Sequence, residues 1–185
     1  MAKVLVLATY PIKNPQHGGQ KRLDAVVSMY RNSFSAVKFA SVFYKKIYKE
    51  YGSDDISLGL TSSVKAEKNP LTGDIICGQA VFDDPKVKKR MAKLITTFKP
   101  TIIHIEQPYI YLGLRPLLKE LNLHPKLVFG SQNIEGPMKR EILEGAHIDA
   151  SEIKSAVDLI DNIETQLSID CDILTACTED DLEKH

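Results

Sequence analysis

The residues best placed to bind an anion follow the first apolar run of the chain, Val4–Ala8. Two adjacent glycines, Gly18 and Gly19, come just before a helical pattern that begins near Gln20. Glycines let a ligand approach the backbone closely, and the free N–H groups and dipole at a helix start favour an anion. The spacing is neither the G-x-G-x-x-G dinucleotide fingerprint nor a Walker motif. A phosphate site and an ordinary tight strand-to-helix turn therefore both stay open.

Polar side chains also follow two later strand-like segments, at 101–106 and 126–130. If these segments are parallel strands, their carboxyl ends meet at one edge of a sheet, where ligands of such sheets bind. The mixture of donors, acceptors and aromatic faces suits a sugar or another polar small molecule better than a hydride cofactor. The residues concerned are His104, Glu106, Gln107 and Tyr109 after the first segment, and Ser131, Gln132, Asn133 and Glu135 after the second.

His104 and Glu106 lie two residues apart, so both side chains point to one face of the strand. They could form an acid/base or metal pair, but no third ligand is evident and no metal site is predicted. For His104 we favour a hydrogen-bonded histidine packed under a helix. Glu106, last in its strand, is the better candidate for a catalytic side chain.

Strand-like and helix-like segments alternate along the chain. Runs that are apolar on both faces, such as Val4–Ala8, are typical of a parallel sheet covered by helices on both sides. The alternation predicts an α/β fold, a Rossmann-like doubly wound parallel sheet with the first strand in its interior. We expect strands at 3–9, 36–43, 55–60, 74–78, 101–106, 126–132 and 172–177, and helices at 20–32, 85–98, 109–121 and 151–169.

Composition narrows the class of protein. The chain has 185 residues, which suits one α/β domain, and its 24 basic residues balance 24 acidic ones. Zero net charge argues against a dedicated nucleic-acid binder. Three cysteines without a C-x-x-C pair favour reduced thiols, so we expect a cytoplasmic protein. The first apolar run is too short for a signal peptide or a membrane span.

The segment Phe43–Tyr51 combines aromatic residues with lysines. As two helical turns it would carry aromatics on one face and lysines on the other, and could contact an anionic membrane surface peripherally. We favour the alternative, a core-facing aromatic stripe with solvated lysines, because two turns are short for an interfacial helix.

Four motifs in this order resemble the N-terminal domain of a GT-B glycosyltransferase, and most closely the large retaining family four (group 1). The resemblance covers nearly the whole chain. The motifs are P-x-x-G-G-x-x-R at Pro15–Arg22, I-I-H-x-x-x-P at Ile102–Pro108, S-Q-N-I-E at Ser131–Glu135 and T-E-D-D at Thr178–Asp181.

The resemblance implies two Rossmann-like domains that face each other across a cleft. The N-terminal domain holds the glycan or lipid-linked acceptor, and the C-terminal domain holds the nucleotide-sugar donor with an E-x7-E signature. The glycine loop of the N-terminal domain faces the donor phosphates, which maps onto Gly18 and Gly19. No cofactor is implied. We expect the acceptor to contact Arg22, Gln107, Tyr109, Asn133 and Glu135.

Two departures from the family pattern concern the site. Gln132 replaces the histidine of the family's H-N-x-E strand end. Many members also carry a catalytic-site histidine two residues beyond the strand histidine, and this chain has Glu106 there. We expect Glu106 to orient an acceptor hydroxyl, or to accept its proton if desolvation raises the pKa of the carboxyl.

On this interpretation residues 1–185 are the acceptor-side domain, and the donor-binding domain is absent from this chain. The domain alone should then lack transfer activity, because catalysis needs donor and acceptor positioned together. Two alternatives stay open: a non-catalytic sugar- or nucleotide-binding module, and a sugar-nucleotide epimerase of similar fold.

Overall fold

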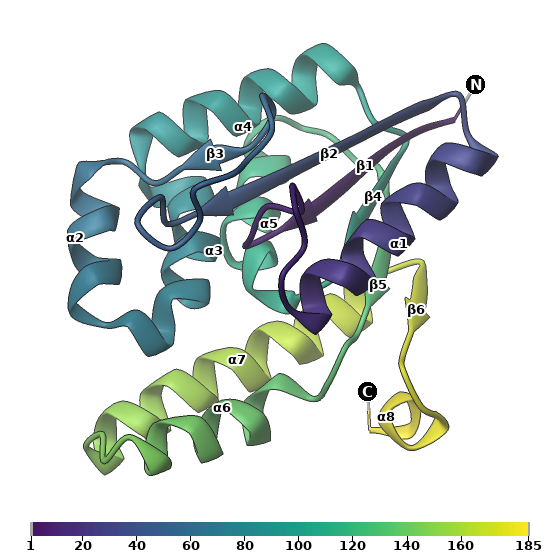
Figure 1. Cartoon of the computed structure of the whole chain (residues 1–185). Coiled ribbons are helices and arrows are strands. Elements are labelled where there is room, and N and C mark those ends of the chain that lie inside the picture. The colour runs from purple at the N-terminus through teal and green to yellow at the C-terminus, as the bar shows by residue number, and fades with distance from the viewer. Residues whose placement is uncertain (1, 185) are drawn as a thin grey trace.

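Six parallel strands form one sheet in the order β3-β2-β1-β4-β5-β6 (Figure 1). The computed structural model describes residues 2–184. The predicted α/β fold with a doubly wound parallel sheet is confirmed, and the first strand lies in its interior as expected. The strands are β1 (Lys3–Ala8), β2 (Ala36–Phe43), β3 (Ile56–Ser57), β4 (Ile102–Ile105), β5 (Lys126–Gly130) and β6 (Ile173–Thr175).

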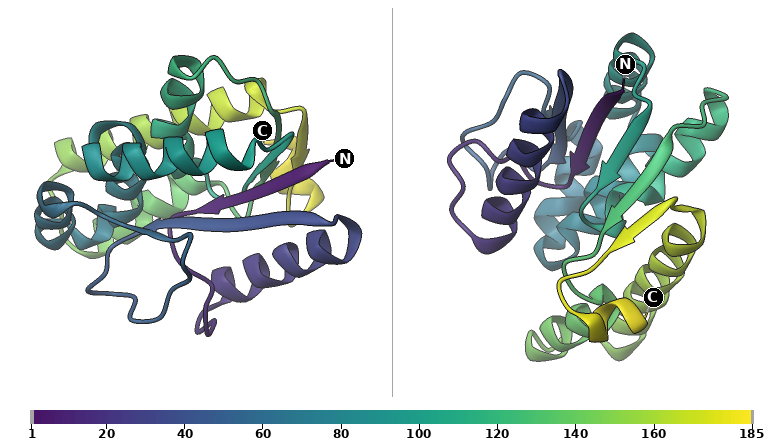
Figure 2. Two further views of the ribbon diagram at one scale, coloured as in Figure 1. Left: turned by 90° about the horizontal axis from the view of Figure 1, so that it is seen from above. Right: turned by 90° about the vertical axis from the view of Figure 1, so that its right-hand side faces the viewer.

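Helices cover both faces of the sheet (Figure 2). One face packs mainly on α1, and the other packs on α3, α4, α5 and the end of α7. The helices are α1 (Gly18–Ser33), α2 (Leu60–Lys68), α3 (Gly73–Asp83), α4 (Pro85–Phe98), α5 (Tyr111–Glu120), α6 (Glu135–Gly145), α7 (Ala150–Asp170) and α8 (Glu179–Glu183), with 3-10 turns at Pro70–Thr72 and Pro108–Ile110.

Strand β1 shows why a strand in the interior of a sheet has a continuous apolar sequence. Val4 and Val6 contact the α1 side, whereas Leu5 and Leu7 contact the opposite helical layer, and all four are fully buried. A strand buried on both faces has no position left for a polar side chain. This burial makes β1 the rigid support for the loop that follows it.

Two predicted strands differ in the structure. The segment 74–78 belongs to α3, and the segment 55–60 contributes only Ile56–Ser57 because α2 begins at Leu60. A short apolar run such as Ile75–Cys77 has no periodicity that separates a strand from a buried helical turn. Helices α2, α6 and α8 were not predicted.

The aromatic segment after β2 forms a turn rather than the two helical turns considered for it. The Tyr44 carbonyl accepts hydrogen bonds from the N–H groups of Ile47 and Tyr48. Tyr44 is buried and Lys45 is exposed, so the aromatics face the core and the lysines face solvent. None of the helices described within residues 2–184 combines the length and the apolar character that a membrane-spanning segment requires.

Helices α3 and α5 approach closely through two glycines. A Cβ atom built on Gly78 would lie 1.8 Å from the carbonyl oxygen of Tyr109, and one on Gly113 would lie 2.5 Å from the carbonyl oxygen of Gly78. Backbone atoms cannot move aside as the end of a side chain can. This contact therefore needs glycine, and it fixes the helices that lie beyond the carboxyl ends of β1 and β4.

We predict that Gly78→Ala lowers the free energy of unfolding by about 3 kcal/mol, because overpacking against backbone outweighs the gain in helix propensity. Urea denaturation measures the change. Gly73→Ala in the same helix is the matched control, since a Cβ there meets no atom within 4 Å. Equal stability of the two variants would contradict the close contact.

Candidate functional site

The carboxyl ends of β1 and β4 form the switch point of the sheet, where successive connections leave in opposite directions. Ligands of open α/β sheets bind in the crevice outside this point. The loop after β1 leads into α1, and the residues after β4 and β5 lie beside that loop. The sequence-predicted site residues all belong to these connections or to the helices that they open.

Helix α1 begins at Gly18, with His17 as its N-cap: the His17 Nδ1 atom accepts a hydrogen bond from the Gln20 N–H at 3.4 Å. The two glycines differ. A Cβ on Gly18 would meet no atom within 4 Å, whereas one on Gly19 would lie 2.5 Å from the Tyr10 hydroxyl. Gly18 therefore leaves open space at the helix start, and Gly19 is needed for internal packing.

The centre of the site is the Glu106 carboxylate, whose residue is 1% exposed. Its Oε1 atom lies 2.8 Å from Nε2 of His104, and its Oε2 atom accepts hydrogen bonds from Arg22 Nε at 3.0 Å and Gln132 Nε2 at 3.1 Å. His104 Nδ1 lies 2.9 Å from the Tyr30 hydroxyl of α1. The favoured interpretation of His104, hydrogen-bonded and packed under a helix, is confirmed.

Burial opposes ionisation of Glu106, but the hydrogen bond and charge of His104 and the charge of Arg22 outweigh it, so the pKa of Glu106 lies below its ordinary value. The alternative that desolvation raises this pKa is wrong. A lowered pKa makes the Glu106 carboxylate a weaker base, and its hydrogen bonds to Arg22, His104 and Gln132 use part of its acceptor capacity. In this structure Glu106 positions other groups.

The group that Glu106 positions toward solvent is the Arg22 guanidinium. The Arg22 side chain is 33% exposed, and its Nη1 atom donates to Cys177 Sγ at 3.2 Å. Arg22 lies one turn along α1 from Gly18. A fixed cation one turn from an open helix start is suited to an anionic group of a ligand.

Gly130 and Tyr10 also belong to this arrangement, although neither was predicted from the sequence as a site residue. A Cβ on Gly130 would lie 2.4 Å from Glu106 Oε1, so only glycine leaves room for the buried carboxylate. The Tyr10 hydroxyl accepts a hydrogen bond from Gln132 Nε2 at 3.3 Å. The position of Gly130 at the end of a predicted strand was the feature of the sequence that could have indicated its place beside His104 and Glu106.

A second buried polar cluster lies under the loop after β4. The Tyr109 hydroxyl donates to the Glu135 carboxylate at 2.6 Å, and both oxygens of Glu164 accept from the Glu135 backbone N–H at 3.1 Å. Glu164 thus caps the start of α6 from the neighbouring helix α7. Gln107 accepts a hydrogen bond from the Thr9 hydroxyl at 2.8 Å.

The residues expected to contact the acceptor fall into a buried group and an exposed group. Gln107, Tyr109 and Glu135 are buried and satisfied by protein partners, whereas Asn133 is exposed and Arg22 is partly exposed. The structure brings Arg22, Glu106 and the glycines together but leaves the three buried residues in the supporting layer. Within residues 2–184, no group of three histidine, cysteine or acidic side chains could hold a metal ion.

Burial raises the pKa of Glu164 to about 7, although the Glu135 N–H group favours its ionised form. Burial also raises the pKa of Glu135 above its ordinary value. The two buried carboxyl groups therefore have pKa values shifted in opposite directions. The pKa of Glu106 is lowered, which favours its ionised form, whereas that of Glu164 is raised, so that Glu164 binds a proton near neutral pH.

No protein-family model, curated protein or solved structure shows significant similarity to this chain.

We predict that Glu106→Gln lowers the free energy of unfolding at pH 7 by about 2 kcal/mol, because the amide places an NH₂ group against hydrogen-bond donors. The wild-type advantage comes from a depressed pKa, so it is present above the unfolded value of about 4.3 and is lost as the pH falls below it. Denaturation at pH 3 and pH 7 checks this. If the free energy of unfolding of the wild type exceeded that of Glu106→Gln by the same amount at pH 3 and pH 7, Glu106 would not be ionised in the folded protein.

We predict the opposite pH dependence for Glu164. The pKa of Glu164 is raised in the folded protein, so its contribution to the free energy of unfolding is complete below about pH 4. That contribution, roughly 1–3 kcal/mol, is lost as the pH rises towards 7. Glu164→Gln keeps an acceptor for the Glu135 N–H and should remove this loss, which denaturation from pH 4 to pH 8 measures. Glu152→Gln, at an exposed position of the same helix, is the control. An unchanged pH profile in Glu164→Gln would refute the assignment.

Proposed function

We propose that this chain is the acceptor-side half of a two-domain GT-B glycosyltransferase, which transfers a sugar from a nucleotide-sugar to a glycan or lipid-linked acceptor. The observation that carries the proposal is the position of Arg22. This cation is fixed by buried Glu106 beside the open start of α1, at the switch point of the sheet. A nucleotide-sugar presents a diphosphate, which a helix start and a guanidinium can both bind.

The rest of the edge supports a polar, hydroxyl-rich ligand. Asn133 is exposed there, and Gln132, partly buried, lies between the Glu106 carboxylate and Tyr10. Amide and guanidinium groups are suited to sugar hydroxyls, which both donate and accept hydrogen bonds. The sequence order of the motifs and the strand order 3-2-1-4-5-6 are both consistent with a Rossmann-like half of such an enzyme.

The proposal also assigns donor and acceptor contacts to different residues and domains. Gly18 faces the donor diphosphate, and so does Arg22, in place of the acceptor contact expected for it from the sequence. Asn133 contacts the acceptor, and a second domain supplies the nucleoside site. Residues 1–185 alone therefore neither transfer sugar nor bind a nucleotide-sugar tightly. Calorimetry that gave a sub-micromolar dissociation constant for a nucleotide-sugar with this chain would argue against this division.

We predict that Gly18→Val lowers kcat/KM for the donor at least about tenfold in the complete protein that contains this chain, because the side chain fills the space at the helix start. Nucleoside diphosphate release from UDP-glucose, UDP-N-acetylglucosamine and GDP-mannose is the assay. Gly73→Val is the matched control, because a Cβ there also meets no atom within 4 Å and the residue lies at the start of α3.

Both variants should melt within about 2 °C of the unmodified protein, since neither Cβ contacts another atom. Normal turnover in Gly18→Val would exclude the helix start as the phosphate site. Saturable sugar binding without nucleotide release from any donor would instead indicate a non-catalytic binding module.

A further inference from the structure

Strand β2 is an edge strand over most of its length. Strand β3 pairs only with Val42 and Phe43, so within the described part of the chain Ala36–Ser41 have β1 on one side and no strand on the other. An unpaired edge presents backbone donors and acceptors that another extended segment can use.

The hydrogen bonds at the end of β2 show which residues face outward. The Ser41 N–H donates to the Asp55 carboxylate at 2.8 Å, and the Phe43 carbonyl accepts from the Leu58 N–H at 3.0 Å, both on the side away from β1. Alternate residues of a strand direct their backbone groups to the same neighbour. Val37 and Phe39 therefore direct their N–H and C=O groups to the open edge.

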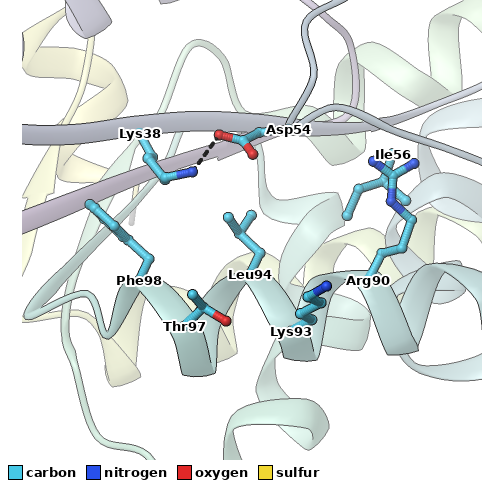
Figure 3. Close-up of a pocket in the computed structure, with 8 residues that line it drawn as sticks. All are labelled: Lys38, Asp54, Ile56, Arg90, Lys93, Leu94, Thr97 and Phe98. Atoms are coloured by element: carbon cyan, nitrogen blue, oxygen red, sulfur yellow. Dashed lines mark hydrogen bonds and ion pairs between the residues drawn. The ribbon is translucent and has the colours of Figure 1, made fainter.

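A groove of about 400 Å³ runs between this edge and α4 (Figure 3). Its apolar surface comes from Ile56, Leu94 and Phe98. Figure 3 shows Lys38 reaching over the groove from β2, and side chains of α4 pointing up towards it. The open strand edge and the groove thus form one continuous feature.

The groove carries an excess of positive charge. Lys38 is paired with Asp54 at 2.7 Å. Arg90 donates a hydrogen bond to the Ser53 carbonyl at 3.3 Å, and among residues 2–184 no acidic side chain forms an ion pair with Arg90 or Lys93. The basic residues are concentrated on α4, which has no acidic residue in a chain of zero net charge: Lys86, Lys88, Lys89, Arg90 and Lys93.

We propose that this groove binds an extended acidic peptide segment of a partner protein, which adds to the sheet beside β2. Backbone pairing would use Val37 and Phe39, as in other peptide sites at sheet edges. Every second side chain of the peptide would face α4, where carboxylates meet Arg90 and Lys93. The intervening side chains would face the opposite side of the sheet, where the partly buried side chains of Val37 and Phe39 are apolar.

The structure favours a peptide over a membrane surface. The apolar face of α4, with Val87, Met91 and Ile95, is buried in the core and cannot insert into lipid. The unpaired backbone groups at the open edge of β2 contribute nothing to membrane binding, whereas they can form hydrogen bonds with the backbone of an extended peptide. The site uses no residue of the switch point, so this proposal stands or falls independently of the proposed transferase function.

The test uses a fluorescein-labelled octapeptide of alternating glutamate and valine, with binding to residues 1–185 measured by fluorescence anisotropy at low salt. The double substitution Arg90→Glu with Lys93→Glu should weaken binding at least about tenfold. Lys89→Glu is the control for a single charge reversal: each member of the double substitution makes the same reversal, but Lys89 is an exposed position of α4 outside the groove, and its substitution should change the affinity less than about twofold.

A second peptide separates strand addition from simple charge attraction. Alternating glutamate and proline keeps the charge but removes backbone N–H donors, so it should bind at least about tenfold more weakly. Hydrogen exchange should slow at the Val37 and Phe39 amides when the glutamate–valine peptide is bound.

Three results would overturn the proposal. They are equal affinity for the two peptides, equal weakening by Lys89→Glu and the double substitution, and binding to phosphatidylserine vesicles in place of the peptide. The first two would indicate diffuse charge attraction, and the third would indicate a membrane contact.

Discussion

The buried ionised carboxylate of Glu106 is the interaction on which the carboxyl edge of the sheet depends. It receives hydrogen bonds from side chains of three separate elements: His104 in β4, Arg22 in α1 and Gln132 after β5. A buried carboxylate is stable only when such donors satisfy it. These hydrogen bonds join α1 and the loop after β5 to β4, and they fix the direction of the Arg22 side chain.

The same requirement explains the small residues around it. Gly130 has no side chain because a Cβ would occupy the space of the carboxylate, and Gly19 has none because Tyr10 and Gln132 fill the space beside it. Gly18 is different, since the space around it is open. The edge thus combines a crowded, hydrogen-bonded interior with groups that a ligand can reach: the open start of α1, the exposed part of Arg22 and the exposed Asn133.

The sequence was most informative where one physical cause dominates. Burial on both faces makes β1 a continuous apolar run. The helix expected at 85–98 matches α4, whose first turn donates hydrogen bonds to the Asp84 carboxylate. The sequence was misleading at 74–78, because the apolar residues Ile75–Cys77 are too few to show a clear period and the glycine contact that places α3 is a tertiary feature. The direction of the Glu106 pKa shift could not be predicted either, because donors from distant parts of the chain lower this pKa.

The central claim is that an anionic ligand group binds between the start of α1 and Arg22, and a titration with inorganic pyrophosphate as the diphosphate probe tests it most directly. Two-dimensional NMR of nitrogen-15-labelled protein would follow the backbone amides and the Arg22 Nε–H resonance. The account predicts saturable, millimolar-range shifts that are largest at Gly18, Gly19 and Arg22 and are lost in Gly18→Val. Shifts confined to the basic residues of α4, or none at the start of α1, would contradict it.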